Sequence, residues 1–282
     1  MKKNQKRINR IVAFMIAVCM VFTAIPSVVK ATEATDMLEL LEPMDLGNAI
    51  MDPPGAVDYS ARSTVNGRDY LYIPIRGKLM LVYDLDAYKE NPADDEAVNV
   101  DVADTGFNVP RGVVEVDGYI YVVGDAAHLY KYDPVTNVGQ NIDLGAFVNN
   151  IYLTIWGLTK DDDGNLYMAA QEYGILKYNT RTGAISTYWN KTMTGTSNSQ
   201  NRTLVYDNGY IYSGDAGVLR KIDLSGNVVK EADVSAQTTT YPMYLSVADG
   251  IVFWGGTRHN GLIARDIENL EPVDIGVNDY SC

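Results

Sequence analysis

The sequence has 282 residues, with 36 acidic and 23 basic side chains, a net charge of −13 and two cysteines. A chain of this length can bury a stable core without disulfide bonds. The excess of negative charge argues against nucleic acid as a partner, because the two would repel each other.

Residues 1–31 differ from the rest of the chain. A basic start is followed by an apolar run from Ile11 to Ile25 and by small or apolar residues up to Ala31, the pattern of a secretory signal peptide. Cleavage is expected after Ala31, with Ala34 as the alternative. Removing 1–31 takes away six basic and no acidic residues, which leaves 17 basic against 36 acidic residues, a charge of −19. We expect a secreted, extracellular protein that does not insert into a membrane after signal removal.

Residues 32–57 form an N-terminal segment that contains a near copy of a later phrase. Residues 41–47 read LEPMDLG and residues 270–276 read LEPVDIG, so both are predicted to be outer blade strands. The chain then stops at Cys282, after a phrase that echoes residues 58–61. We expect a fragment of a ring of six to eight blades, the alternative being a five-bladed ring with a spare N-terminal segment.

One short phrase recurs five times, and its first residues are 49, 46, 45 and 41 positions apart. Turn residues followed by alternating apolar and aromatic residues, with a period in the forties, are typical of propeller blades. The predicted class is therefore all-β, a β-propeller of four-stranded antiparallel blades with five blades present. The five copies start at Asp69, Gly118, Gly164, Gly209 and Gly250.

The second copy shows how one blade is predicted. Strands are expected at Gly112–Val116, Tyr119–Val123, His128–Tyr132 and Gln140–Leu144, and Asp117-Gly118 is a tight hairpin turn. The first blade has a longer third turn, from Ala87 to Glu96. The expected blades span approximately residues 58–105, 106–150, 151–195, 196–238 and 239–282.

The phrases His128–Asn137 and Gly174–Gly183 resemble the third and fourth strands of YVTN-, PQQ- and streptogramin-lyase-type propellers. The resemblance covers nearly all of residues 58–276. It implies the propeller fold but no particular function, because these motifs are structural turns.

The entrance of each inner strand is the predicted ligand face. We compared the residue eight positions before the first apolar or aromatic residue of each second strand. In the third blade, whose turn has one extra residue, we took the residue nine positions before Asn165. Three of the five residues are arginines, whose planar fork suits carboxylate, sulfate or phosphate, and the tryptophan offers a flat face for a sugar. Alternatively, the arginines pair with acidic residues of neighbouring blades and the tryptophan packs between blades. The five residues are Arg62, Arg111, Trp156, Arg202 and Met243.

Loops between the second and third strands lie on the same face and add Arg258, His128 and His259 as candidates. The run Asp161–Asn165 does not have the ligand spacing of an EF-hand and is predicted to be a hairpin turn, so no metal site is expected. No cofactor is expected either, since the sequence contains no Walker loop, HExxH or GxSxG motif.

Three functions remain open at this point. The first is a non-catalytic binding module for an extracellular glycan or surface protein, as part of a larger protein. The second is a lyase acting on an anionic substrate, with Arg62, Arg111 and Arg202 stabilising the intermediate and His128 or His259 as the base. The third is a docking platform for other proteins.

Overall fold

The computed structural model describes residues 60–275, with gaps at 92–93, 191–200, 216, 236–241 and 257–261. The signal peptide predicted at 1–31 and the strand predicted at 41–47 lie outside the described residues. Within them the chain forms five antiparallel sheets in succession, each following the chain order of its strands. This confirms the predicted all-β class and the five propeller blades.

The strands of each blade are given in chain order. The first blade contains β1 Ala61–Val65, β2 Arg68–Ile75, β3 Leu79–Asp84 and β4 Asn99–Asp104. The second contains β5 Pro110–Val116, β6 Tyr119–Gly124, β7 His128–Asp133 and β8 Val138–Asp143. The third contains β9 Ile155–Lys160, β10 Asn165–Ala170, β11 Gly174–Asn179 and β12 Ile185–Asn190. The fourth contains β13 Asn201–Asp207, β14 Tyr210–Asp215, β15 Val218–Asp223 and β16 Val228–Asp233, and the fifth β17 Pro242–Ala248, β18 Ile251–Gly256 and β19 Leu262–Asp266.

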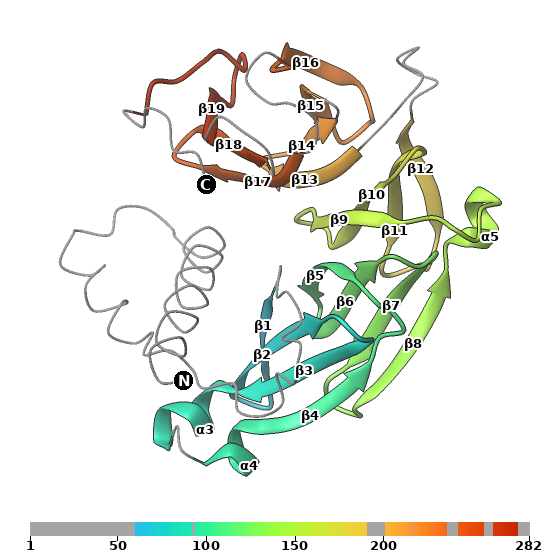
Figure 1. Ribbon diagram of the computed structural model, residues 1–282, viewed down its shortest axis with the longest axis vertical. Coiled ribbons are helices and arrows are strands. Elements are labelled where there is room, and N and C mark those ends of the chain that lie inside the picture. The colour runs from blue at the N-terminus through green and yellow to red at the C-terminus, as the bar shows by residue number, and fades with distance from the viewer. Residues whose placement is uncertain are drawn as a thin grey trace, which may run out of the picture.

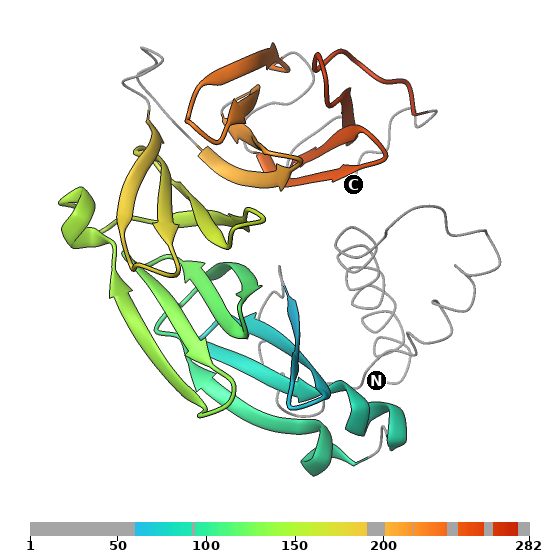
Figure 2. The same cartoon turned by 180° about the vertical axis from the view of Figure 1, so that it is seen from behind.

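The blades pack through their first strands. β5 lies against β1, β9 against β5, β13 against β9 and β17 against β13. The five sheets therefore follow one another around a common centre, as Figures 1 and 2 show, with β1 and β17 apart in both views. The size of a complete ring remains a prediction.

The recurring phrase builds the core between blades. Its fourth residue is Tyr72, Tyr121, Tyr167 or Tyr212 in the first four blades, and each is 1% exposed or less. Tyr72 packs in one cluster with Ile120 and Tyr132 of the next blade. The alternation of strand residues thus places an aromatic ring on the face that meets the neighbouring sheet.

The hairpins between first and second strands explain the glycines of the phrase. Asp117 and Gly118 have φ angles of 50° and 81°, and Asn208 and Gly209 have 46° and 84°. Two successive positive φ angles define the tight turn that suits the twist of a hairpin, and Asn, Asp and Gly tolerate them best.

Two regions differ from the sequence-based expectation. The long turn expected at Ala87–Glu96 is replaced by two short helices, α3 Leu85–Glu90 and α4 Asp95–Val98. Asp84 caps α3 by accepting hydrogen bonds from the backbone N–H groups of Asp86 and Ala87. A short helix, α5 Gly145–Val148, also lies between β8 and β9.

The last blade departs from the expected four strands. Its described part contains three strands, and the outer strand expected at 270–276 is reduced to an isolated bridge between Arg265 and Pro272. Pro272 has no N–H group to donate, which limits its pairing with β19.

Candidate functional site: an arginine–tryptophan stack

A β-bulge lies at the start of the inner strand in four successive blades. In the second blade Pro110 pairs with Gly124 and Gly112 with Val123, so Arg111 is the extra residue. The same shift leaves Trp156 as the extra residue in β9, Arg202 in β13 and Met243 in β17. A bulge bends the strand and redirects the side chain of its extra residue. Three of the predicted site residues therefore share one structural position.

The bulges bring two arginines onto one indole ring. The guanidinium carbons of Arg111 and Arg202 each lie 4.0 Å from the ring centroid of Trp156. Because β9 lies between β5 and β13, the two arginines reach the indole from opposite sides. A cation over an aromatic face is attracted by the electron density of the ring, and this attraction is strongest for tryptophan.

Glycines beside the bulges allow this close approach. A Cβ atom on Gly157 would lie 2.9 Å from the carbonyl oxygen of Arg202, and one on Gly112 would lie 2.9 Å from Cβ of Leu158. Both distances are shorter than normal van der Waals contacts. The pairs Arg111-Gly112 and Trp156-Gly157 thus combine a long side chain with a residue that lets the next inner strand come near.

A hydrogen bond fixes the edge of the indole. Nε1 of Trp156 donates to Oε1 of Gln171 at 2.6 Å, and the backbone N–H of Gln171 donates to the carbonyl of Thr154 at 3.0 Å. Since an indole N–H can only donate, the amide oxygen of Gln171 must face it. The NH₂ group of Gln171 therefore points away from Trp156.

The stack concentrates positive charge in a negative protein. The two guanidinium carbons are separated by at most twice their distance to the ring, and both arginines and Trp156 are half-buried. Two cations this close repel each other, and the indole between them offsets part of that cost. Guanidinium groups are chemically suited to contact anions such as carboxylate, sulfate or phosphate.

Trp156 was expected to offer a flat face to a sugar. The two guanidinium groups cover its two faces, so a sugar ring could stack there only by displacing an arginine. The role of Trp156 as a platform for a sugar stays a prediction.

Arg62 does not join the stack. Tyr70 pairs with Ser63 in the first blade, whereas Tyr119 pairs with Val116 in the second. Arg62 therefore corresponds to Glu115, much nearer the hairpin than Arg111. The reason is that strand pairing in the first blade continues past Tyr70 to the pair Val65 and Arg68, next to the turn at Asn66 and Gly67. Counting back from Tyr70 therefore reaches a residue closer to the turn than counting back from Tyr119 does.

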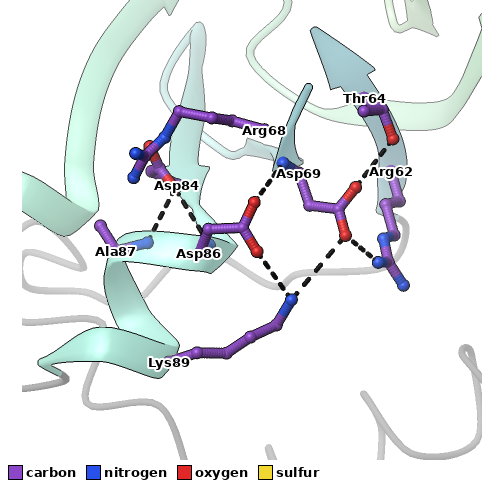
Figure 3. A network of polar contacts seen from close by, with 8 residues as sticks. All are labelled: Arg62, Thr64, Arg68, Asp69, Asp84, Asp86, Ala87 and Lys89. Carbon is purple, nitrogen blue, oxygen red and sulfur yellow. Dashed lines mark hydrogen bonds and ion pairs between the residues drawn. The ribbon is translucent and has the colours of Figure 1, made fainter. Parts of the chain in front are cut away.

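Arg62 belongs instead to a polar network on the hairpin side of the first blade (Figure 3). Its guanidinium donates to Asp69, which also accepts from the Thr64 hydroxyl at 2.7 Å. The hydrogen bond from Thr64, together with that from Arg62, lowers the pKa of Asp69. Lys89 approaches the same carboxylate to 3.8 Å. Arg62 is thus paired with an acidic residue, but Asp69 lies in its own blade and not in a neighbouring blade as the alternative expected.

His128 packs against the connection between the first two blades. Its Nε2 lies 3.0 Å from the carbonyl oxygen of Thr105, and its ring stacks on Phe107 with 4.2 Å between centroids. A carbonyl oxygen only accepts, so Nε2 carries the proton and donates. This arrangement accounts for His128 as a packing residue. Arg258 and His259 lie outside the described residues.

The acidic run after β9 is a turn held by hydrogen bonds to Asp161. Asp161 is 4% exposed and accepts from the backbone N–H of Asn165 at 2.8 Å, the side-chain amide of Asn165 at 2.8 Å and the hydroxyl of Tyr167 at 2.9 Å. The described residues contain no cluster of three potential metal ligands. These bonds give Asp161 a structural role.

The sequence matches no protein-family model and no curated protein. The structure is similar to the extracellular domain of the one-component system BT4673 from B. thetaiotaomicron, with a TM-score of 0.59, 17% identity, and coverage of 82% of this chain and 29% of that one. It is also similar to the Neurospora crassa Pan2 WD40 domain, with a TM-score of 0.56 and 12% identity over 78% of this chain and 65% of that one. The AfRom2 CNH domain gives a TM-score of 0.54 at 11% identity, over 76% of this chain and 68% of that one. At these identities the similarity establishes the propeller fold alone.

Proposed function

We propose that the protein is a secreted, non-catalytic β-propeller binding module for an extracellular carbohydrate or protein, and that it forms part of a larger polypeptide. The observation that carries this proposal is the stack of Arg111, Trp156 and Arg202 at the entrances of three successive inner strands. Propellers commonly bind ligands through loops and strand ends on one face of the ring. A preformed pair of guanidinium groups at that place is suited to hold a ligand.

Secretion is proposed from the sequence of residues 1–31. In the part of the chain that the structure describes, no helix is both long and apolar enough to span a bilayer. One of the similar structures is an extracellular domain, which is in keeping with this proposal.

A carbon–oxygen lyase is the less favoured alternative. Such an enzyme needs a base beside the cations that stabilise its intermediate. His128 is held by Thr105 and Phe107, and Arg62 lies near the hairpin of its own blade, so the described residues do not assemble the predicted set. A lyase would release unsaturated, ultraviolet-absorbing products from uronate polymers, and such release would overturn the non-catalytic assignment.

The binding proposal is tested with the secreted full chain on arrays of glycans and surface proteins. Arg111→Gln and Arg202→Gln should each reduce binding to the array ligand that the unaltered protein binds. Arg181→Gln is the matched control, because it removes the same charge at an exposed turn between β11 and β12. Absence of binding to every array, or equal binding by all three variants, would refute the proposed module.

A further inference from the structure

We propose that the hairpin side of the propeller carries a further binding site, a cavity between the first two blades that takes a neutral sugar ring. This inference goes beyond the proposed function, because it concerns the other end of the inner strands and does not use the arginine–tryptophan stack. In β5, Arg111 of the stack and Glu115 of the cavity are four residues apart, and Glu115 is the one beside the hairpin.

The cavity has a volume of about 440 Å³ and lies where the inner strands β1 and β5 approach each other. Sites for small molecules usually have volumes of about 300–1,000 Å³, so a single sugar ring fits this space. The side chains that line the cavity are all polar, and they carry charges of both signs. The six lining residues are Arg62, Ser63, Thr64, Asp69, Glu115 and Gly118.

The first blade provides hydrogen-bond donors to the cavity. The side chain of Arg62 is 61% exposed and, among the described residues, it contacts Asp69 through Nη2 (Figure 3). A guanidinium group has five N–H donors, so this contact leaves donors for a ligand. Asp69 is held in place from its other oxygen by the hydroxyl of Thr64 at 2.7 Å. The hydroxyl group of Ser63, which can both donate and accept, completes this wall.

The second blade provides acceptors from the opposite wall. Oε1 of Glu115 accepts from the backbone N–H of Gly118 at 2.7 Å, and Oε2 lies 3.3 Å from Nζ of Lys160. These two contacts fix the orientation of the carboxylate. An ionised carboxylate has about four lone-pair positions, so both oxygens keep the capacity to accept from a ligand.

The arrangement of charges around the cavity disfavours an ionic ligand. Arg62 lies beside Asp69, and Glu115 lies beside Lys160, so each of these groups has an opposite charge next to it. A ligand carboxylate at Arg62 would lie close to Asp69. A ligand ammonium group at Glu115 would lie close to Lys160. Both placements bring like charges together, whereas a neutral hydroxyl group meets no such repulsion.

The combination of donors and acceptors suits a sugar. A hydroxyl group both donates and accepts, and a sugar ring presents several hydroxyl groups on neighbouring carbons. One of these can accept from Arg62 while the next donates to Glu115 across the cavity. Hydrogen bonds to charged groups are roughly twice as strong as those between neutral groups, which favours the sugar over an apolar molecule of the same size.

The experiment measures the binding of the full chain to the methyl glycosides of glucose, galactose and mannose by saturation-transfer NMR and titration. Glycine and glucuronate serve as charged probes. We expect at least one glycoside to bind, and Arg62→Gln and Glu115→Gln should each weaken that binding by at least about tenfold, as for a lost hydrogen bond to a charged group. The matched controls are Arg181→Gln and Glu268→Gln, which change exposed residues outside the cavity and should bind normally. The matching trisaccharide, measured in parallel, distinguishes the end of a glycan chain from a free sugar as the source of the ring.

Three outcomes would overturn this inference. The first is the absence of binding to all three glycosides, and the second is tighter binding of glycine or glucuronate. The third is binding that Arg111→Gln abolishes and Arg62→Gln leaves unchanged, which would locate the sugar at the stack and so support the proposed function alone. Conversely, a loss confined to Arg62→Gln and Glu115→Gln would support the cavity whatever the stack binds. A loss counts only where thermal unfolding is unchanged, and Arg62→Lys or Glu115→Asp replaces a variant that fails this requirement.

Discussion

The guanidinium group of Arg220 forms a 3.1 Å ion pair with Asp215, and the two side chains are only 3% and 4% exposed. Arg220 also donates to Glu231 at 2.8 Å, and its guanidinium carbon lies 5.0 Å from the ring centroid of Trp189 in the preceding blade. Asp215, which lies at the end of β14 on the predicted ligand face, is therefore part of the interior of the fourth blade.

Replacing Arg220 with methionine should be strongly destabilising. The change removes the cation that faces a buried carboxylate, and we expect a loss of about 3–5 kcal/mol in the free energy of unfolding. Urea denaturation provides the measurement. The double variant Arg220→Met with Asp215→Leu should recover most of the loss, because neither charge is then left in the interior. A double variant as unstable as the single one would contradict this explanation.

Replacing Asp161 with alanine should destabilise the third blade. The change leaves the backbone and side-chain N–H groups of Asn165 and the hydroxyl of Tyr167 without their acceptor. We expect a loss of at least about 2 kcal/mol in urea denaturation. Asp163→Ala is the control, since Asp163 is exposed, and it should stay within about 0.5 kcal/mol of the unaltered protein. Equal effects of both substitutions would argue against the hydrogen-bonded turn.

Replacing Gly157 with alanine should force β9 and β13 apart. The added Cβ would lie 2.9 Å from the carbonyl oxygen of Arg202, and we expect a cost of about 1–3 kcal/mol together with weaker ligand binding. Gly255→Ala is the matched control, because a Cβ atom at Gly255 would lie 3.9 Å from its nearest neighbour, which is an ordinary contact. The measurement is the thermal unfolding temperature of each of the two variants. A stable Gly157→Ala protein would mean that the two inner strands have room to adjust.

Alkaline solution should unfold the protein as its tyrosines ionise. Burial raises the pKa of the interblade tyrosines above the usual value near 10. A pKa raised in the folded state means that this contribution to stability is complete below about pH 10 and is lost as the pH rises above it. Tyrosinate absorbance and circular dichroism should therefore change together. Ionisation of all tyrosines in a still folded protein would contradict their burial. The four residues concerned are Tyr72, Tyr121, Tyr167 and Tyr212.

The fold could be predicted because its signals are local. Asp117-Gly118 and Asn208-Gly209 define the hairpins, and the apolar alternation around Tyr121 and Tyr212 defines the buried faces. The helices after Asp84 were missed because they are short and replace a turn inside an otherwise β repeat.

The candidate site could be predicted only in part. Spacing identified Arg111, Trp156 and Arg202, because a bulge at a constant distance from a turn leaves a constant interval in the sequence. The same count selected Arg62 wrongly, since it started from Tyr70 and not from the turn at Gly67. The contact of both arginines with one indole depends on how neighbouring blades pack, and no single blade contains that information.

The bulge position has a consequence for how such a repeat can diversify. Its extra residue takes no part in the ladder between first and second strands, so the side chain there can change without disturbing strand pairing. Each of the second to fifth blades thus has one position at which the side chain can vary. Selecting residues at 111, 156, 202 and 243 would then be a direct way to build new specificities on this scaffold.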